Sequence, residues 1–132
     1  MELSELETVY QSEQKIKLKN AQTVFEETKD LQTWTKEAFV VFCLDAELKI
    51  ISREIISIGI LNSCIIHPRE IYRTAIRRNA NSIIVAHNHP SGNLTPSPED
   101  INITNQLKKA GDILQIPMMD HVIITKNGYH SI

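Results

Sequence analysis

The alternation of apolar and polar residues predicts a series of strands and helices, with the clearest strand near the middle of the chain. Residues 38–45, AFVVFCLD, form a nearly continuous apolar run that is rich in β-branched and aromatic residues. Such a run is typical of a strand that is buried on both faces. Residues 45–47 predict a turn, and residues 48–58 predict the returning strand of a hairpin, which Gly59 and Asn62 end.

The pattern at the N-terminus fits two different elements. Within residues 2–14, Leu6, Thr8 and Tyr10 would share one face of a strand, whereas Leu3, Leu6 and Tyr10 also fit a helical stripe. We favour an edge strand for this segment.

The next residues change from a strand pattern to a helical one. Residues 15–19 alternate, with Ile16 and Leu18 on one side and lysines on the other. From Asn20 the apolar positions recur at helical spacing, and an asparagine is a favourable N-cap. The apolar positions of this predicted helix are Val24, Phe25, Leu31 and Trp34.

The C-terminal half alternates helices and strands. Pro68 predicts the start of a helix, because proline is favourable in the first helical turn. Residues 82–87, SIIVAH, predict a short strand that runs into the loop NHPSGNLTPSP. The alternation indicates an α/β layered fold with a mixed central sheet flanked by helices. The remaining predicted elements are a helix at about 98–114 with Ile101, Ile103, Leu107 and Ala110 on its buried face, a strand at 118–125, a turn at 126–128 and a strand at 129–132.

Length and charge narrow the possible partners. The chain has 132 residues, which fits one domain, and its net charge is -2. Because the chain has no net positive charge, we expect DNA binding to be weak or absent. The lysines within residues 15–19 and the arginines within residues 73–78 are interpreted as solvated faces.

Hydropathy and cysteine usage indicate a cytoplasmic protein. No apolar stretch reaches the length of a membrane span, and residues 1–14 are polar and acidic rather than typical of a secretory signal. Cys43 and Cys64 lie in apolar runs and are interpreted as buried, reduced thiols. A cysteine-based zinc site is not expected, because the sequence has no Cys-x-x-Cys pair.

The loop after residues 82–87 carries the candidate chemistry. His87 and His89 are two residues apart at a strand end, where alternate side chains point to the same side, and Asp100 follows in the next helix. Two imidazoles and a carboxylate, with one position left for water, form the ligand set of a catalytic zinc site. The spacing leaves two simpler explanations open. The histidines can be polar loop residues, and Ser97 and Asp100 can serve only to start a helix at Pro98.

This loop also resembles a known signature. HNHPSGNLTPSPED has the form His, any residue, His, seven residues, Ser, two residues, Asp, and so resembles the JAMM (JAB/MPN) motif at His87, His89, Ser97 and Asp100. The flanking sequence HPREIYRTAIRRNANSIIVAHNHPSG and residues 117–121 closely resemble the RadC family. The resemblance covers about residues 37–132.

The resemblance implies a fold and a domain organisation. The fold is the JAMM/MPN layout, which is similar to that of cytidine deaminases. Residues 37–132 would form the metal-binding core, and residues 1–36 would be an N-terminal strand and helix segment that packs on the same domain. Full-length relatives carry an N-terminal helix-hairpin-helix segment that binds DNA. We expect this chain to be too short to include one.

The resemblance also implies the function. JAMM enzymes are zinc-dependent hydrolases, so Zn²⁺ would be the cofactor and a peptide or isopeptide the substrate. Glu37, at the start of the first central strand, would be the general base, with Glu70 and Glu99 as rivals, and Ser97 would donate a hydrogen bond to the oxyanion. The alternative is a non-catalytic metal-binding accessory module associated with DNA repair or a mobile element. Deaminase chemistry is disfavoured, because the His-x-Glu and Pro-Cys-x-x-Cys motifs are both absent.

Four further polar residues have weaker signals. His67 precedes Pro68 and is either a partner of a metal ligand or a helix-start residue. Asp120 and His121 are interpreted as a buried structural pair before an apolar strand. His130 is expected to be exposed.

Overall fold

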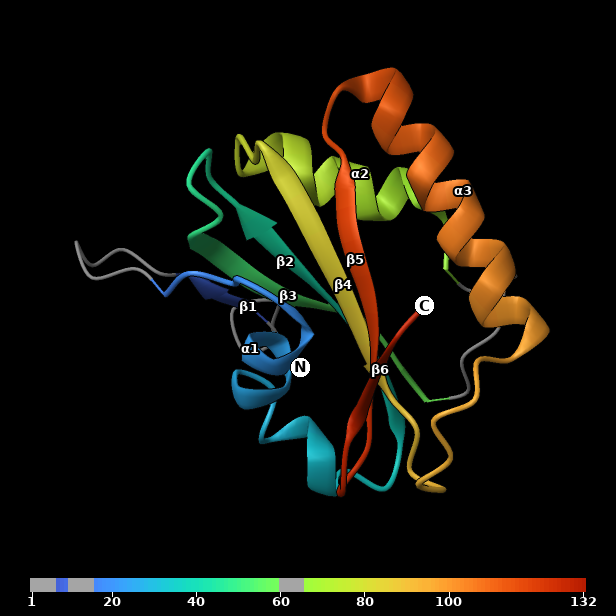
Figure 1. Ribbon diagram of the computed structural model, residues 1–132. Coiled ribbons are helices and arrows are strands. Elements are labelled where there is room, and N and C mark those ends of the chain that lie inside the picture. Colours follow the sequence, from blue (N-terminus) through green and yellow to red (C-terminus); the bar gives the residue numbers. More distant parts are fainter. Residues whose placement is uncertain (1–6, 10–15, 60–65) are drawn as a thin grey trace.

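A computed structural model describes residues 7–9, 16–59 and 66–132 of the chain. These residues form a mixed six-stranded sheet with the strand order β1-β3-β2-β4-β5-β6, shown in Figure 1. The sheet and its flanking helices confirm the predicted α/β layered fold. The strands are β1 (Glu7–Val9), β2 (Glu37–Leu44), β3 (Ile50–Gly59), β4 (Ser82–Asn88), β5 (Met118–Ile124) and β6 (Tyr129–Ser131).

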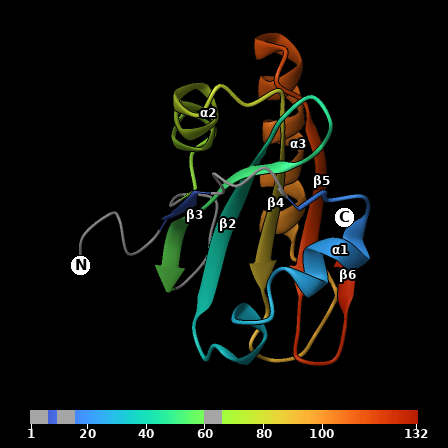
Figure 2. The same ribbon diagram turned by 90° about the vertical axis from the view of Figure 1, so that its left-hand side faces the viewer.

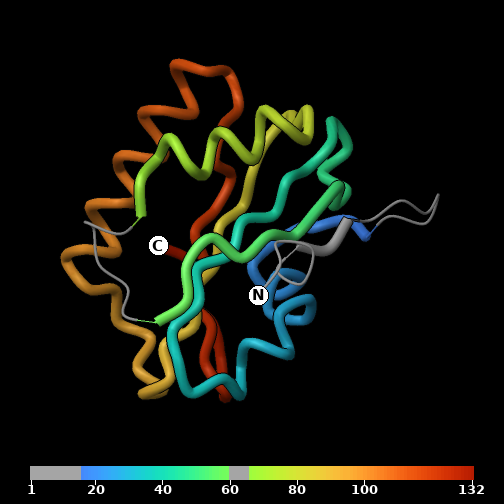
Figure 3. Tube along the Cα trace, turned by 180° about the vertical axis from the view of Figure 1, so that it is seen from behind, coloured from blue at the N-terminus to red at the C-terminus, as the bar shows by residue number. Residues whose placement is uncertain are grey.

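Helices cover both faces of the sheet. The helices α2 (Pro68–Arg77) and α3 (Pro98–Leu114) pack on one face, and α1 (Ala21–Glu26) with the short 3₁₀ helix η2 (Leu31–Thr33) packs on the other (Figure 2). Seen from behind in Figure 3, α2 (yellow-green) crosses the strands, and α3 (orange) runs down one side. None of the helices in the described ranges is long and apolar enough to cross a bilayer.

The central strand β2 explains why residues 38–45 are apolar without alternation. Phe39, Val41 and Cys43 face the core under α2 and α3, whereas Val40 and Phe42 face the core under α1 and η2. Both neighbours of β2, the strands β3 and β4, run antiparallel to it. A strand in this position has no solvent-facing side, so every position selects an apolar residue.

The N-terminal predictions are confirmed in part. β1 pairs with β3 at the edge of the sheet, which confirms an edge strand for residues 7–9, while residues 2–6 and 10–14 lie outside the described ranges. Leu18 is buried, and Lys17 forms an isolated bridge with Lys49.

The single helix predicted from Asn20 to Trp34 is wrong in its length. Asn20 caps α1 by accepting a hydrogen bond from the Thr23 N–H, as expected, but the helix ends after Glu26. The Thr28 hydroxyl donates to the carbonyl of Val24 at 2.8 Å and so satisfies a group at the helix end. The chain then turns, and η2 brings Leu31 back into the same core.

The predicted bounds of α3 are confirmed at both ends, and its predicted buried face needs one correction. Ile103 and Leu107 are buried, but Ile101 is 47% exposed. Ile103 lies nearly on the side opposite to Ile101, because a helix turns by about 100° per residue, so the two cannot both face the sheet. The buried thiol of Cys43 is free, as predicted, and burial raises its pKa to about 11. Cys64 lies outside the described residues.

Candidate metal centre

The two histidines of the centre are placed by the end of β4. His87 belongs to β4, and His89 continues the strand geometry because its N–H donates to the Ile124 carbonyl of β5 at 2.9 Å. Two residues apart in an extended chain, their side chains lie on the same face. That face is the one covered by α2 and α3, because His87 pairs with Phe39 across the sheet.

Asp100 is placed by the cap of α3. The Ser97 hydroxyl accepts a hydrogen bond from the Asp100 N–H at 3.0 Å, and the Ser97 N–H donates to Asp100 Oδ2 at 2.9 Å. Ser97 is therefore the N-cap and Pro98 starts the helix, as the sequence predicts. The reciprocal bonds form a capping box, which fixes both the backbone and the carboxylate of Asp100.

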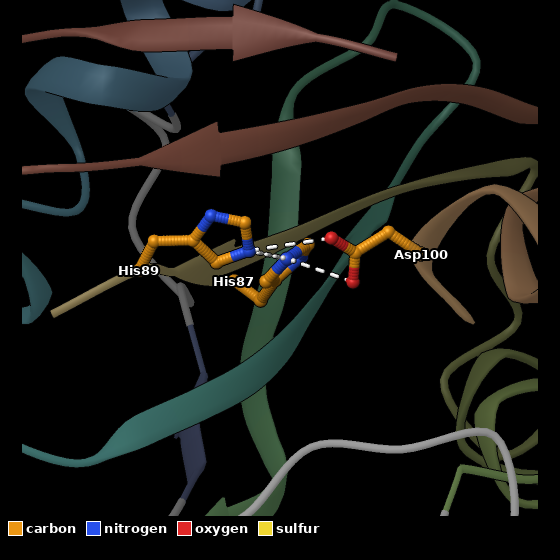
Figure 4. Close-up of side chains that lie close together, drawn as sticks. All are labelled: His87, His89 and Asp100. Atoms are coloured by element: carbon orange, nitrogen blue, oxygen red, sulfur yellow. Dashed lines mark hydrogen bonds and ion pairs between the residues drawn. The ribbon is translucent and has the colours of Figure 1, made fainter. Parts of the chain in front are cut away.

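These three side chains converge, as Figure 4 shows. His87 Nε2 lies 2.9 Å from His89 Nε2 and 3.2 Å from Asp100 Oδ1, and His89 Nε2 lies 3.3 Å from Asp100 Oδ2. One ligand atom from each residue lies within 4.8 Å of the others. Two nitrogens bound tetrahedrally to zinc at 2.0–2.1 Å would be about 3.3 Å apart, so a small ring movement would accommodate the ion.

Asp100 and the histidines shift one another's pKa values within the site. Burial opposes ionisation of Asp100, but hydrogen bonds from His87 and His89 outweigh it and hold the pKa of the carboxyl well below its ordinary value. The hydrogen bond to Asp100 also raises the pKa of His89, and the charge of Glu37 adds to that increase. The site therefore favours the ionised form of the Asp100 carboxyl.

His121 is buried, as the sequence predicts, but its ring pairs with His87 rather than with Asp120. Its ring is fully buried, and its Nε2 lies 2.8 Å from His87 Nδ1. The predicted pairing with Asp120 involves only the backbone, because Asp120 Oδ1 accepts from the His121 N–H. The parallel register of β5 against β4, which pairs His121 with Val85, brings the ring beside His87, and no local pattern reveals that register.

Three other hydrogen bonds in and beside the centre also went unpredicted. His89 Nδ1 lies 2.7 Å from the carbonyl oxygen of Asn93, within the loop that follows β4. The amide of the buried Asn88 accepts from the Ala38 N–H at 2.6 Å and donates to the Lys36 carbonyl at 2.9 Å. Asn88 thereby joins the end of β4 to the start of β2 on either side of Glu37.

Glu37 begins β2 at the same end of the sheet as the histidines. It lies two residues before Phe39, which pairs with His87, so its side chain emerges on the histidine face. The influence of its charge on His89 is consistent with that position. Of the two rivals, Glu70 lies in the first turn of α2, and Glu99 is exposed in the first turn of α3.

The structure gives His67 and His130 no contact with the three converging side chains among the described residues. His67 occupies the N-cap position of α2 without a side-chain capping bond, so it serves as a helix-start residue. His130 is exposed, as predicted.

A hollow of about 410 Å³ borders His89, and its lining is formed by residues 32–35, Pro90 and Lys126. Solvent-accessible space therefore adjoins the centre on the side of Trp34.

Known proteins resemble this chain over most of its length. The UPF0758 protein of Chlorobium chlorochromatii is 53% identical over 97 residues, which cover 74% of this chain and 44% of that protein. The UPF0758 protein of Thermotoga maritima is 44% identical over 115 residues, or 87% and 52% of the two chains. For Chlorobaculum tepidum the identity is 48% over 117 residues, or 88% and 53%. The chain spans about half the length of these curated relatives.

The family assignment rests on a longer match than the loop motif alone. The model of the RadC-like JAB domain matches residues 18–132, a range that includes β2, β4, the capped start of α3 and the three converging side chains. The motif resemblance and the observed sheet agree with this match. The chain belongs to the RadC-like JAB domain family.

Proposed function

We propose that this domain is a zinc-dependent hydrolase of the JAMM type that cleaves a peptide or isopeptide amide bond. The observation that supports it best is the convergence of His87 Nε2, His89 Nε2 and the Asp100 carboxylate. Two nitrogens and a carboxylate match the protein ligands of a catalytic zinc site, which keeps a fourth position for water. Magnesium and calcium prefer ligand sets made only of oxygen atoms, whereas two of the three ligand atoms here are imidazole nitrogens.

Each residue has a definable task in that reaction. Bound zinc would lower the pKa of a water molecule to about 7 and polarise the substrate carbonyl. Glu37 accepts the proton of the attacking water and returns it to the leaving amine. The Ser97 hydroxyl donates a hydrogen bond to the developing oxyanion. That donation is compatible with the cap, because the cap bond from Asp100 uses a lone pair of the hydroxyl oxygen.

The test compares the wild type with Glu37→Gln on a mixture of peptides and isopeptide-linked peptides, with cleavage read by mass spectrometry. Glu37→Gln should retain zinc and lose turnover, because a carboxamide cannot accept the proton. Glu99→Gln, at an exposed position on α3, is the matched control and should cleave like the wild type.

Three outcomes decide between the functions. Cleavage that requires zinc and Glu37 supports the hydrolase. Full activity of Glu37→Gln would assign the base to another residue, with Glu70 as the first to test. Zinc binding without cleavage of any peptide in the mixture would favour the non-catalytic accessory module.

A further inference from the structure

We propose that His121 and Thr104 are positioning residues that fix the tautomer of His87, so that its Nε2 lone pair is directed at the metal. The inference rests on the proposed metal centre. It concerns a chain of buried hydrogen bonds behind His87 that runs from β4 through β5 to α3. Outer partners of this kind orient metal-bound histidines and raise their basicity.

The direction of the chain is set at Thr104. Its Oγ1 lies 2.7 Å from the carbonyl oxygen of Asp100, one turn earlier in α3. A carbonyl oxygen can only accept, so the single hydroxyl proton of Thr104 is donated there. At its other side, Thr104 Oγ1 lies 2.6 Å from His121 Nδ1. With its proton already used, Thr104 can only accept, and His121 must donate from Nδ1.

The direction of these hydrogen bonds continues from His121 to His87. His121 is fully buried beside Phe39, with the two ring centroids 5.5 Å apart and an interplanar angle of 71°. An uncharged imidazole suits these apolar surroundings. A neutral ring that carries its proton on Nδ1 has a bare Nε2. This Nε2 lies 2.8 Å from His87 Nδ1, so His87 donates from Nδ1, and its neutral ring keeps a lone pair on Nε2.

His89 reaches the same state by a shorter route. Its Nδ1 lies 2.7 Å from the Asn93 carbonyl oxygen, which can only accept. In their neutral forms both histidines thus direct Nε2 lone pairs at one point, with the two nitrogens 2.9 Å apart and facing the Asp100 carboxylate. Two lone pairs and a negative charge at that separation require a cation between them, either a proton or a metal ion.

The packing around the chain restricts the ring planes. The ring of Phe39 stacks on that of His87, with the ring centroids 5.9 Å apart and an interplanar angle of 9°. The same Phe39 ring meets the His121 ring edge-on. Thr104 is buried on the same helix as Asp100, so the chain links the outer side of His87 to the backbone of a second ligand. A displacement of Thr104 would therefore disturb two of the three proposed ligands.

The test uses Thr104→Val and Thr104→Ser, which keep a side chain of similar size. Valine has the shape of threonine without the hydroxyl, whereas serine keeps the hydroxyl. Zinc affinity is measured by competition with a chromophoric chelator, and the absorption spectrum of the cobalt-substituted protein reports ligand geometry. Thr104→Val should bind zinc 10–100-fold more weakly and alter the cobalt bands, because loss of an outer partner has this cost. Thr104→Ser should remain close to the wild type.

A second pair of variants and a direct probe of the tautomers complete the test. His121→Gln retains a donor and an acceptor at similar spacing and should bind zinc better than His121→Phe, which has neither. Nitrogen-15 NMR of the imidazoles should show the proton of His121 on Nδ1 in the wild type and a shift towards Nε2 in Thr104→Val. This spectrum can be recorded without metal.

The outcomes separate this inference from the proposed function. If wild type binds zinc and Thr104→Val and His121→Phe bind it equally well, the inference is wrong and the metal centre stands. If wild type does not bind zinc, the proposed function fails, and the metal-free tautomers decide the positioning claim. A wild-type His121 that carries its proton on Nε2 would overturn the inference in either case.

Discussion

At the scale of single residues, Asp100 combines several tasks. Its N–H binds the Ser97 hydroxyl, its Oδ2 accepts from the Ser97 N–H, and its carbonyl accepts from Thr104. Its carboxylate also faces both histidines. Asp100, in the first turn of α3, thus takes part both in the helix cap and in the candidate metal site, so helix capping and the position of its carboxylate depend on the same bonds.

Ser97→Gly tests whether Ser97 also donates a hydrogen bond to the oxyanion, in addition to capping α3. Glycine caps within a few tenths of a kcal/mol of serine, and it keeps the backbone N–H that binds Asp100 Oδ2. The melting temperature and zinc content should therefore change little. Turnover should fall by about 10²–10³-fold, as for the loss of one oxyanion donor. The measurement is kcat with a substrate identified in the peptide screen, and wild-type turnover in the variant would limit Ser97 to capping.

At the scale of elements, the packing of α2 against α3 depends on a glycine. A Cβ added at Gly111 would collide with the Tyr72 hydroxyl and lie 2.7 Å from the carbonyl oxygen of Ile116. The Tyr72 hydroxyl already donates to the Leu107 carbonyl at 2.9 Å, so it cannot move without loss of that bond. The glycine therefore permits close contact between the two helices.

Gly111→Ala should destabilise the fold although alanine is the better helix former. The gain in helix propensity is about 1 kcal/mol, whereas overpacking costs about 1–3 kcal/mol and a backbone atom is among the groups displaced. Chemical denaturation measures the net change in the free energy of unfolding. Gly128→Ala is the matched control, because its Cβ would meet only Leu94 at an ordinary 3.5 Å. Equal stability of the two variants would contradict this account.

A second element-level contact joins the segment after α1 to β3. Asp30 binds Arg53 through two hydrogen bonds of 2.8 Å. Burial opposes ionisation of Asp30, but Arg53 outweighs it and lowers the pKa of the carboxyl below its ordinary 3.8. A pKa lowered by folding contributes stability above the unfolded value, and that contribution disappears as the pH falls through the folded value.

Asp30→Asn should therefore destabilise the protein at pH 7 by ~0.2–1 kcal/mol, the range for exposed ion pairs. The difference from wild type should shrink below about pH 4, where the wild-type carboxyl also becomes protonated. Urea denaturation of both proteins at pH 7 and at low pH measures the two differences. A difference that stays constant or grows towards low pH would show that the ion pair is not its source.

The helices α1 and α3 show which features of the fold could be predicted from local sequence signals. The start of α3 was predictable because Ser97, Pro98 and Asp100 mark a helix start through their own chemistry. The end of α1 was not, because the Thr28 hydroxyl and the turn into η2 interrupt an apolar pattern that continues to Trp34. Local capping signals were informative, whereas the spacing of apolar residues alone did not distinguish one long helix from two short elements in one core.

At the scale of the whole molecule, strand register assembles the site. His87, His89 and Asp100 were identifiable because they fit one motif that spans a single loop and its two ends. His121 and Asn88 were missed because their contacts depend on β5 lying parallel to β4 and on β2 lying antiparallel to β4. The sheet thus brings together the start of one strand and the ends of others, and that arrangement is invisible in any local segment.

Zinc content tests the central claim most directly. Protein purified without added metal should contain about one zinc per chain by elemental analysis, because two imidazoles and a carboxylate already converge. His89→Ala, which removes one proposed ligand, should lose the metal, while His130→Ala, at an exposed position, should retain it. A wild type that contains no zinc and binds none when it is added would contradict the account, as would a His89→Ala variant with wild-type affinity.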